Sequence, residues 1–224
     1  MKFFRIVLVM AIFISSSTIY AAESKEMKRT GFLSTYDGLK PADDSMMEWL
    51  FLNENAKFNS YDKIILDYVV FFVKEDAEYK GLQIDEMQQL AEAFHKSVIE
   101  ALSDKYQFVS KPGPGVMRVR LALTNVEPIK LGRSFLTSVV PVGMAINLAK
   151  VGVTGESIGV GRTSMEGEIF DSMSGMRLCA AIDIDVGRKY SGYKGDTKWA
   201  HAEGTFEAWG KDLQKFLDKV SGRK

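Results

Sequence analysis

The stretch Val116-Met-Arg-Val-Arg-Leu-Ala-Leu-Thr124 decides the fold class, because its side chains alternate in character along the chain. One face is apolar and the other carries two arginines and an alanine: Met117, Val119, Leu121 and Leu123 against Arg118, Arg120 and Ala122. Alternation at every second position is typical of a β-strand with one buried face. We therefore expect a sheet whose apolar face is covered by other elements.

Two segments with helical periodicity can provide that cover. Residues 84–104 and 205–220 place apolar side chains at every third or fourth position. The stripes consist of Ile84, Met87, Leu90, Ala91, Phe94, Val98 and Leu102 in the first helix, and of Phe206, Trp209, Leu213, Phe216, Leu217 and Val220 in the second. We expect both stripes to share one core against a β-strand at residues 61–73, which is rich in β-branched and aromatic residues.

Residues 164–186 predict a β-hairpin. Its apolar positions lie on one face only if odd positions of the first strand oppose even positions of the second. Pairing Phe170 with Arg177 meets this condition and leaves a short loop around Gly175. This register turns Met165, Gly167, Ile169, Leu178, Ala180, Ile182, Ile184 and Val186 inward. It places four carboxylates together on the outer face, namely Glu166, Glu168, Asp183 and Asp185.

The order of these elements predicts an α+β fold: a mixed, mostly antiparallel sheet of four to five strands, with the two amphipathic helices packed on one face. We divide the chain into a secretory signal peptide at residues 1–21, an irregular N-terminal segment at 22–60 packed on the domain, and a single α+β domain at 61–224. An apolar, glycine-rich insertion at 128–162 interrupts this domain, and a short strand is expected at 106–110.

The N-terminus has the pattern of a bacterial secretory signal peptide. Lys2 and Arg5 precede an uninterrupted apolar run at residues 6–14, and a small-residue exit follows. We expect cleavage after Ala21, so that the mature chain begins at Ala22. The apolar run is much shorter than the roughly 20 residues that a membrane-spanning helix needs. The expected location is the periplasm of a Gram-negative bacterium.

Composition and spacing argue against several classes of protein. The chain carries 29 basic and 29 acidic residues, so no excess of positive charge favours nucleic acid. Residues 152–163 are glycine-rich but depart from the phosphate-binding loop, because, counted from Gly155, Val160 stands where the second glycine belongs. Cys179 is the only cysteine, so no intramolecular disulfide forms, and we expect a small, unreactive strand residue.

The sequence offers no constellation of residues for catalysis, and we expect no catalytic, cofactor-binding or metal residues. His95 and His201 lie far apart in the chain, and we interpret His95 as a packed or half-exposed residue. The four outer carboxylates of the hairpin suggest a divalent cation site as one hypothesis. The simpler interpretation is that Arg118 and Arg120 pair with them across the sheet.

The insertion contains a charge-free stretch at residues 134–149, with Lys130, Arg133, Lys150 and Arg162 around it. We favour an apolar flap folded over the sheet, since a monomer seldom exposes so much contiguous apolar surface. The alternative is an element that docks on a partner or on a membrane surface. The residues that would make either contact are Phe135, Leu136, Val139, Val140, Met144, Ile146 and Leu148.

Short motifs spread over nearly the whole mature chain carry a family resemblance. They are Gly31-Phe32-Leu33-Ser34 with Tyr36 and Leu39-Lys40-Pro41, Tyr61-Asp62, residues 112–118, residues 166–172, Gly175, and Phe206 with Trp209 and Leu213. Together they resemble a bacterial family of envelope lipoproteins of unknown function (DUF3313). Members of that family typically carry a lipobox cysteine, which does not follow the signal region here. The resemblance implies an envelope protein and supplies no catalytic or ligand residues.

We therefore expect an exported, non-catalytic binding or accessory protein of the cell envelope, whose partner is an unidentified envelope protein. The alternative is a peripheral protein of the outer membrane that docks through residues 134–149. An enzyme has the least support, and neither a nucleic acid nor a nucleotide is an expected partner.

Overall fold

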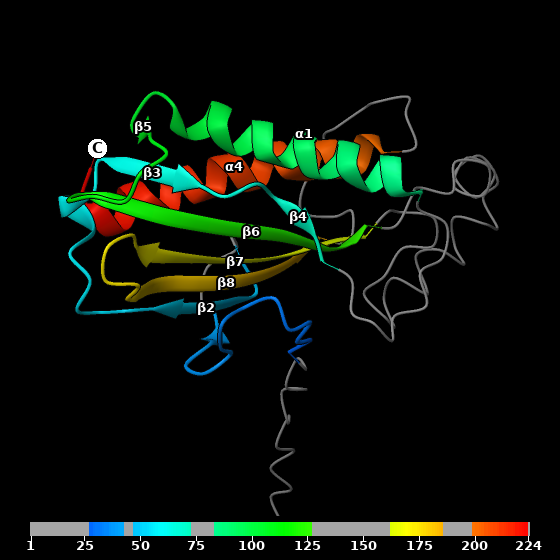
Figure 1. Cartoon of the computed structure of the whole chain (residues 1–224). Helices are drawn as coiled ribbons and strands as arrows, with labels where there is room; N and C mark the ends of the chain where they lie inside the picture. The colour runs from blue at the N-terminus through cyan, green and yellow to red at the C-terminus, as the bar shows by residue number, and fades with distance from the viewer. Residues whose placement is uncertain (1–26, 43–46, 73–82, 127–161, 186–198, 224) are drawn as a thin grey trace, which may run out of the picture.

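A mixed sheet of eight strands carries two long helices on one face (Figure 1). The structure is a computed structural model that describes residues 27–42, 47–72, 83–126, 162–185 and 199–223. The strands are β1 (Lys40–Pro41), β2 (Trp49–Leu52), β3 (Lys63–Leu66), β4 (Val70–Phe71), β5 (Gln107–Phe108), β6 (Val116–Val126), β7 (Thr163–Asp171) and β8 (Arg177–Asp185). The helices are α1 (Ile84–Leu102) and α4 (Ala200–Ser221), with a short 3-10 turn, η1 (Phe58–Ser60).

The strand order is β1-β2-β8-β7-β6-β3-β5, and β4 also pairs with β6. The pairs from β1 through β8 and β7 to β6 are antiparallel, whereas β3, β4 and β5 join in parallel. The predicted α+β class and the mixed, mostly antiparallel sheet are confirmed, but the predicted number of four to five strands is wrong. The additional strands are β1 and β2, and the strand expected at 61–73 is divided into β3 and β4, whereas β5 lies within the short strand expected at 106–110. Strands β1 and β4 have two residues each, which is too short for alternation to be recognised in the sequence.

Both helices lie where their apolar stripes predict. Phe94 of α1 stacks on Phe206 of α4 with ring centroids 5.2 Å apart, and Trp209 lies 5.5 Å from Phe94. These rings belong to the main core cluster, which also contains Ile64 of β3. The predicted shared core is therefore confirmed. Helix α4 begins at Ala200, earlier than the predicted residue 205.

Close approach of the two helices depends on Gly210 of α4. A Cβ atom at this position would lie 2.8 Å from the carbonyl oxygen of Ser97 and 3.2 Å from the Cβ atom of Ala101, both on α1. A side chain there would push the helices apart. Gly210 therefore fixes the spacing of the helical layer over the sheet.

The segment predicted as one strand at residues 61–73 consists of two strands, β3 and β4, that pair in parallel with successive parts of β6. Between them the Asp67 carboxylate accepts a hydrogen bond of 3.0 Å from Arg118 Nε. Tyr68 is 85% exposed and stacks on His95 of α1, with ring centroids 5.1 Å apart. The prediction of a single long strand at residues 61–73 is therefore wrong, because the chain leaves the sheet at Tyr68.

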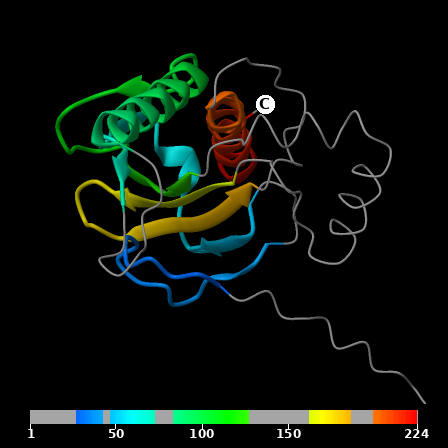
Figure 2. The same cartoon turned by 90° about the vertical axis from the view of Figure 1, so that its right-hand side faces the viewer.

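The N-terminal residues 27–39, here called the strap, cover the sheet face opposite the helices (Figure 2). Leu33 of the strap is buried against Ala180 and Ile182 of β8 in a second, smaller apolar cluster. The region expected to be irregular, 22–60, thus contributes β1, β2 and η1 within the described residues. Both faces of the sheet are covered, which explains why its strands carry apolar side chains on both sides.

The hairpin of β7 and β8 contains a β-bulge that the sequence analysis did not foresee. Phe170 pairs with Arg177, as predicted, but the next pair is Ile169 with Cys179. Leu178 is therefore an extra residue on β8, and it shifts the register of the rest of the hairpin by one position. Because side chains alternate along a strand, this shift turns the remainder of β8 over.

The bulge separates the carboxylates that were expected to share one face. Glu166 and Glu168 point toward the strap, whereas Asp183 points toward α4. Ala180 and Ile182, expected to face the helices, pack under the strap instead. The predicted carboxylate quartet is therefore wrong. The side chain of the fourth member, Asp185, lies outside the described residues.

Candidate binding cavity

Two buried carboxylates tie the strap to the sheet. Tyr36 Oη donates to Glu166 at 2.6 Å, and the backbone N–H of Thr30 donates to the other oxygen of Glu166 at 3.1 Å. Ser34 donates to Glu168 from its backbone N–H at 3.1 Å and from its hydroxyl at 2.8 Å. Burial of a carboxylate is tolerated only when its oxygens are hydrogen-bonded in this way.

Arg120 completes this arrangement from β6. Its Nη1 atom lies 2.7 Å from Glu168 Oε1, and its guanidinium lies 5.2 Å from the centre of the Phe32 ring of the strap. The predicted cross-strand pairing is therefore confirmed for Arg120. It is wrong for Arg118, which binds Asp67 instead. These groups hold the strap on the sheet.

Asp183 lies on the other face of the sheet, in the apolar layer beneath α4. Trp209 Nε1 donates a hydrogen bond of 2.6 Å to Asp183 Oδ2, and both residues are buried. Within the described ranges, no three His, Cys, Asp or Glu side chains gather as metal ligands would. Asp183 therefore positions the Trp209 ring above the sheet.

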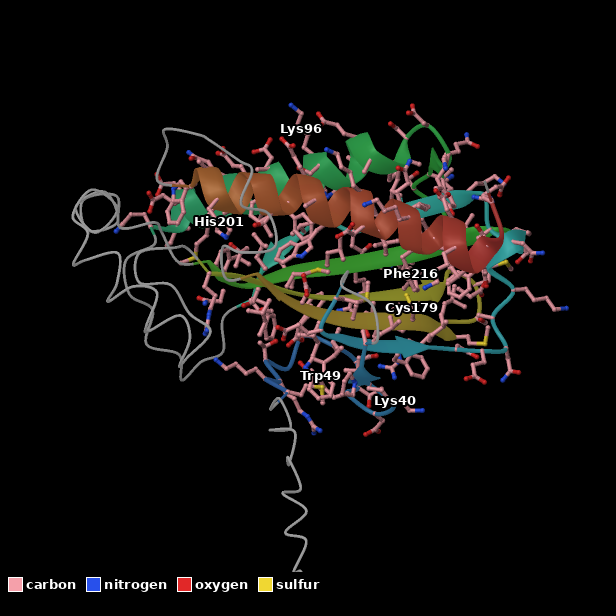
Figure 3. The ribbon with its side chains drawn as sticks, turned by 180° about the vertical axis from the view of Figure 1, so that it is seen from behind. Lys40, Trp49, Lys96, Cys179, His201 and Phe216 are labelled. Carbon is pink, nitrogen blue, oxygen red and sulfur yellow. The ribbon has the colours of Figure 1, made fainter. Side chains whose placement is uncertain are left out.

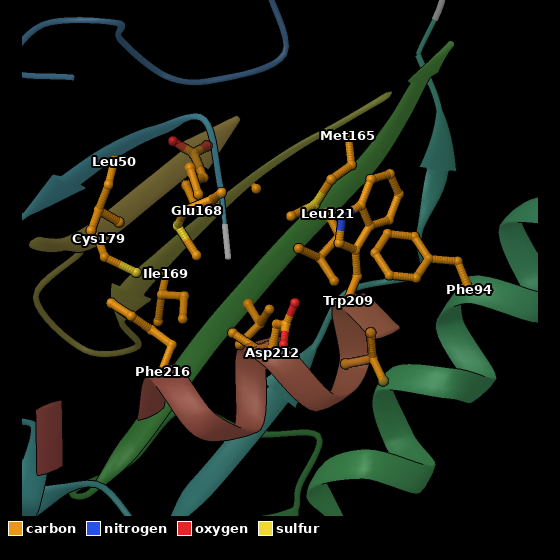
Figure 4. Close-up of a pocket in the computed structure, with 16 residues that line it drawn as sticks. Leu50, Phe94, Leu121, Met165, Glu168, Ile169, Cys179, Trp209, Asp212 and Phe216 are labelled. Atoms are coloured by element: carbon orange, nitrogen blue, oxygen red, sulfur yellow. The ribbon is translucent and has the colours of Figure 1, made fainter. Parts of the chain in front are cut away.

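Next to this ring, α4 and the sheet enclose a cavity of about 40 Å³ (Figure 4). Its roof is formed by Trp209, Leu213 and Phe216 of α4. The floor comes from all three central strands and includes Leu121, Ile169, Cys179 and Ala181. Protein interiors rarely leave voids larger than a water molecule. This space is therefore a departure from the close packing of the rest of the core.

Small residues on neighbouring strands create the space. Gly167 of β7 pairs directly with Ala181 of β8. A Cβ atom at Gly167 would lie only 2.6 Å from Leu121 Cδ2, so the Leu121 side chain fills the position above the glycine. Ala181, the partner of Gly167 across the hairpin, has a small side chain and lines the cavity between β8 and α4.

The Cys179 thiol at the floor of the cavity is unreactive. Cys179 is buried at its floor, and desolvation raises the pKa of the thiol to about 12. A thiol with such a pKa is almost entirely protonated at neutral pH and is a poor nucleophile. Figure 3 shows Cys179 beside Phe216 beneath α4. The expectation that Cys179 is an unreactive strand residue agrees with this environment.

Residues in and next to β2, and on α4, complete the lining at the edge of the helical layer. Met47 and Leu50 line the cavity from the sheet side, and Leu213 and Asp212 line it from α4. The Asp212 side chain is only 13% exposed and accepts a contact of 3.1 Å from Lys215 Nζ. The lining is thus apolar on the sheet side here and includes the carboxylate of an ion pair on the helix side.

Neither of the two histidines singled out by the sequence lines the cavity. His95 lies on the outer side of α1 under Tyr68, and burial lowers the pKa of its imidazole. His201 lies within the first turn of α4 and not before it, as was expected. The cleavage position Ala21 and the candidate contact segment 134–149 lie outside the described residues. No helix in the described part is long and apolar enough to cross a membrane.

The cavity itself was missed by the sequence analysis, because its lining has the same composition as any core. One signal was present in the sequence. Gly167 and Ala181 are small residues at positions that face the helices. Because they pair directly across the hairpin, they supply little side-chain volume at one place in the core. The bulge at Leu178 conceals that alignment, since the expected register put Ala181 on the outer face.

Comparison with known proteins gives one family match and several distant structural similarities. A family model described as "Protein of unknown function (DUF3313)" matches residues 28–213. No curated protein matches the chain.

Among solved structures, the PelC dodecamer from Paraburkholderia phytofirmans is 6% identical with a TM-score of 0.37, covering 68% of this chain and 88% of that chain. A DUF330 protein from Xanthomonas campestris is 10% identical with a TM-score of 0.38, covering 76% and 91%. A DUF4136 protein from Bacteroides thetaiotaomicron is 12% identical with a TM-score of 0.37, covering 78% and 95%.

Proposed function

We propose that this chain, which belongs to the family of proteins of unknown function DUF3313, is an exported, non-catalytic binding protein of the cell envelope. The observation that carries the proposal is the apolar cavity between α4 and β8. Apolar cavities of this kind stay dry and take up apolar groups. An apolar group bound there would pack against the small side chain of Ala181.

A non-catalytic role is supported by what the buried polar groups do. Glu166 and Glu168 hold the strap, and Asp183 holds the Trp209 ring. The Cys179 thiol is buried with a raised pKa. The three carboxylates are used to position elements of the fold and the thiol is buried, whereas general acid–base or nucleophilic catalysis needs such groups open to a substrate.

Export is the second part of the proposal, and it is supported by the signal-like residues 1–21. Osmotic shock of the native host should release the protein, and N-terminal sequencing should find Ala22 as the first residue. A full-length form that stays with the membrane fraction would contradict export. Release only after a high-salt wash of membranes would instead favour a peripheral protein that docks through residues 134–149.

The binding role is tested by filling the cavity. Native mass spectrometry of protein released from the periplasm should detect a bound apolar molecule, and the variant Ala181→Val should have lost it. The valine side chain has two more carbon atoms than alanine, and they would occupy part of the cavity. The matched control is Ala93→Val, which adds the same volume at a half-buried position of α1. A wild type without adduct, or equal occupancy in Ala181→Val, would contradict the proposal.

A further inference from the structure

We propose that a groove between α1 and β4 binds an extended segment of a partner protein, which adds a strand beside β4 and carries an arginine that Tyr68 and Glu92 recognise. This surface goes beyond the proposed function, because it shares no lining residue with the cavity under α4. Three features of the described residues carry it: exposed apolar side chains, a place for a strand in the sheet, and a carboxylate beside an exposed ring.

The groove gathers apolar side chains that the rest of the fold leaves uncovered. Helix α1 lies over β4 (Figure 1), and the two enclose a groove of about 610 Å³. This volume is within the roughly 300–1,000 Å³ of ligand-binding clefts. Six large apolar side chains of the described residues are exposed, and three of them line the groove: Tyr68 at 85%, Val70 at 42% and Ile84 at 75%. Exposed apolar side chains that gather in one place are typical of an interaction site.

The sheet has a place for one more strand at this groove. Strand β3 pairs with β6 on one side and with β5 on the other. Strand β4 follows β3 along β6 and, among the described strands, pairs with β6 alone. A strand added on the other side of β4 would therefore continue the row of β5. Sheet edges of this kind bind extended peptides through backbone hydrogen bonds, and residues 68–71, at about 3.3 Å each, give room for a segment of about four to five residues.

The charge of the groove favours a cationic side chain. Glu92 of α1 lines the groove, is exposed, and forms no ion pair with another described residue. The neighbouring cations are already bound, since Lys96 Nζ lies 3.6 Å from Glu100 and Arg118 binds Asp67. Glu92 lies more than two turns from either end of α1, and the helix dipole acts only near the ends, so it does not oppose a cation here.

Tyr68 provides the second contact for this cation. One face of its ring stacks on His95, which follows Glu92 by one turn of α1. Burial lowers the pKa of His95, so its imidazole adds no positive charge at neutral pH. A guanidinium is planar and carries several donors, so it can stack on the open face of the Tyr68 ring and bind a carboxylate at the same time. Arginine therefore fits this part of the groove.

The test uses the synthetic peptide acetyl-Val-Thr-Arg-Thr-Val-amide, whose arginine and two valines share one face of a strand. Isothermal titration should detect binding to the wild type, and a peptide with glutamine in place of arginine should bind about two- to fivefold more weakly, as expected for an exposed charge contact. A version with all five backbone nitrogens methylated has no N–H to pair with β4 and should not bind.

The protein variant Glu92→Gln should weaken the arginine peptide by the same two- to fivefold and leave the glutamine peptide unchanged. The matched control is Glu207→Gln, which removes an exposed carboxylate of α4 that does not line the groove and should change neither affinity. Equal affinities of the arginine and glutamine peptides for the wild type, or no effect of Glu92→Gln, would overturn the recognition of a cation. Binding of the methylated peptide would overturn the added strand.

A photo-cross-linker distinguishes a partner from the chain itself. With p-benzoylphenylalanine in place of Ile84, irradiation of the purified protein with the arginine peptide should give a cross-linked adduct of the two. A cross-link to residues 127–161 of the same chain, or to a second copy, would overturn the proposal, because the groove would then be filled without a partner. Absence of any binding by the arginine peptide would also overturn it, whereas the cavity under α4 is tested separately by Ala181→Val.

Discussion

Trp209 on α4 donates a hydrogen bond of 2.6 Å from its indole N–H to the buried carboxylate of Asp183 on β8. The bulge at Leu178 is what brings Asp183 to this face. The bond joins the helical layer to the sheet at the edge of the cavity. Because Trp209 forms part of the cavity roof, the register of the hairpin, which places Asp183, also determines the position of that roof.

The first prediction concerns this bond. Trp209→Phe keeps an aromatic ring but removes the donor, and we expect it to lower the free energy of unfolding by about 2–4 kcal/mol, from the lost bond to a charged group and the smaller ring. Urea unfolding measures the change. Phe206→Leu removes aromatic area from the same core without touching a carboxylate. If Trp209→Phe in an Asp183→Asn background were as costly as it is alone, the bond would not be the cause.

The second prediction concerns the strap. Glu168→Gln keeps the shape of the side chain but weakens the bonds from Arg120 and Ser34, so we expect a loss of about 1–3 kcal/mol. Hydrogen exchange should quicken in residues 28–41 before it does in α1. The control Glu100→Gln alters an exposed pair with Lys96 at 3.6 Å and should cost less than about 0.5 kcal/mol. Equal effects of the two variants would show that the strap does not depend on Glu168.

The third prediction follows from the pKa of Cys179, which burial raises from an ordinary 9.0 to about 12. Below about pH 8 the thiol is protonated in both states, so pH has no effect through this group. Above its unfolded pKa, the unfolded chain loses the proton while the folded chain keeps it. The free energy of unfolding of the wild type should therefore fall relative to Cys179→Ala as the pH rises through 9. Parallel pH profiles for the two proteins would mean that the thiol is solvated.

The fourth prediction concerns the contact of α1 and α4. Gly210→Ala should destabilise the protein by about 1–3 kcal/mol, because the new methyl group meets Ser97 O at 2.8 Å. Alanine is otherwise the better helix former by about 1 kcal/mol, so a stabilised variant would show that the helices separate freely. The control Gly113→Ala meets only Val116 Cγ2, at 3.8 Å.

The helical layer could be predicted from the sequence, because stripes of apolar residues report directly on burial. Phe94 and Trp209 were assigned to one core on spacing alone, and they are in contact. Helix α4 is longer than predicted, since Ala200 and Ala202 are small residues that the apolar stripe does not register, although both are buried.

The register of the hairpin could be predicted only up to the bulge. Pairing Phe170 with Arg177 was correct, but nothing in the alternation of β8 marks Leu178 as an extra residue. Both faces of the sheet are buried, so apolar side chains satisfy either register. The carboxylates decide between them: Glu166 finds donors in the strap and Asp183 finds one on α4. Those partners are distant in sequence and only the folded chain brings them together.

The cavity depends on the same register, so the central claim, that it is a binding site, is tested most directly at Cys179. This thiol lies on the cavity floor and is the only cysteine of the chain. Its rate of modification by methyl methanethiosulfonate should fall as octanol is added to the wild type, because a bound chain keeps the reagent out. In Ala181→Val the rate should not respond to octanol. A wild-type rate that is independent of octanol would contradict the account.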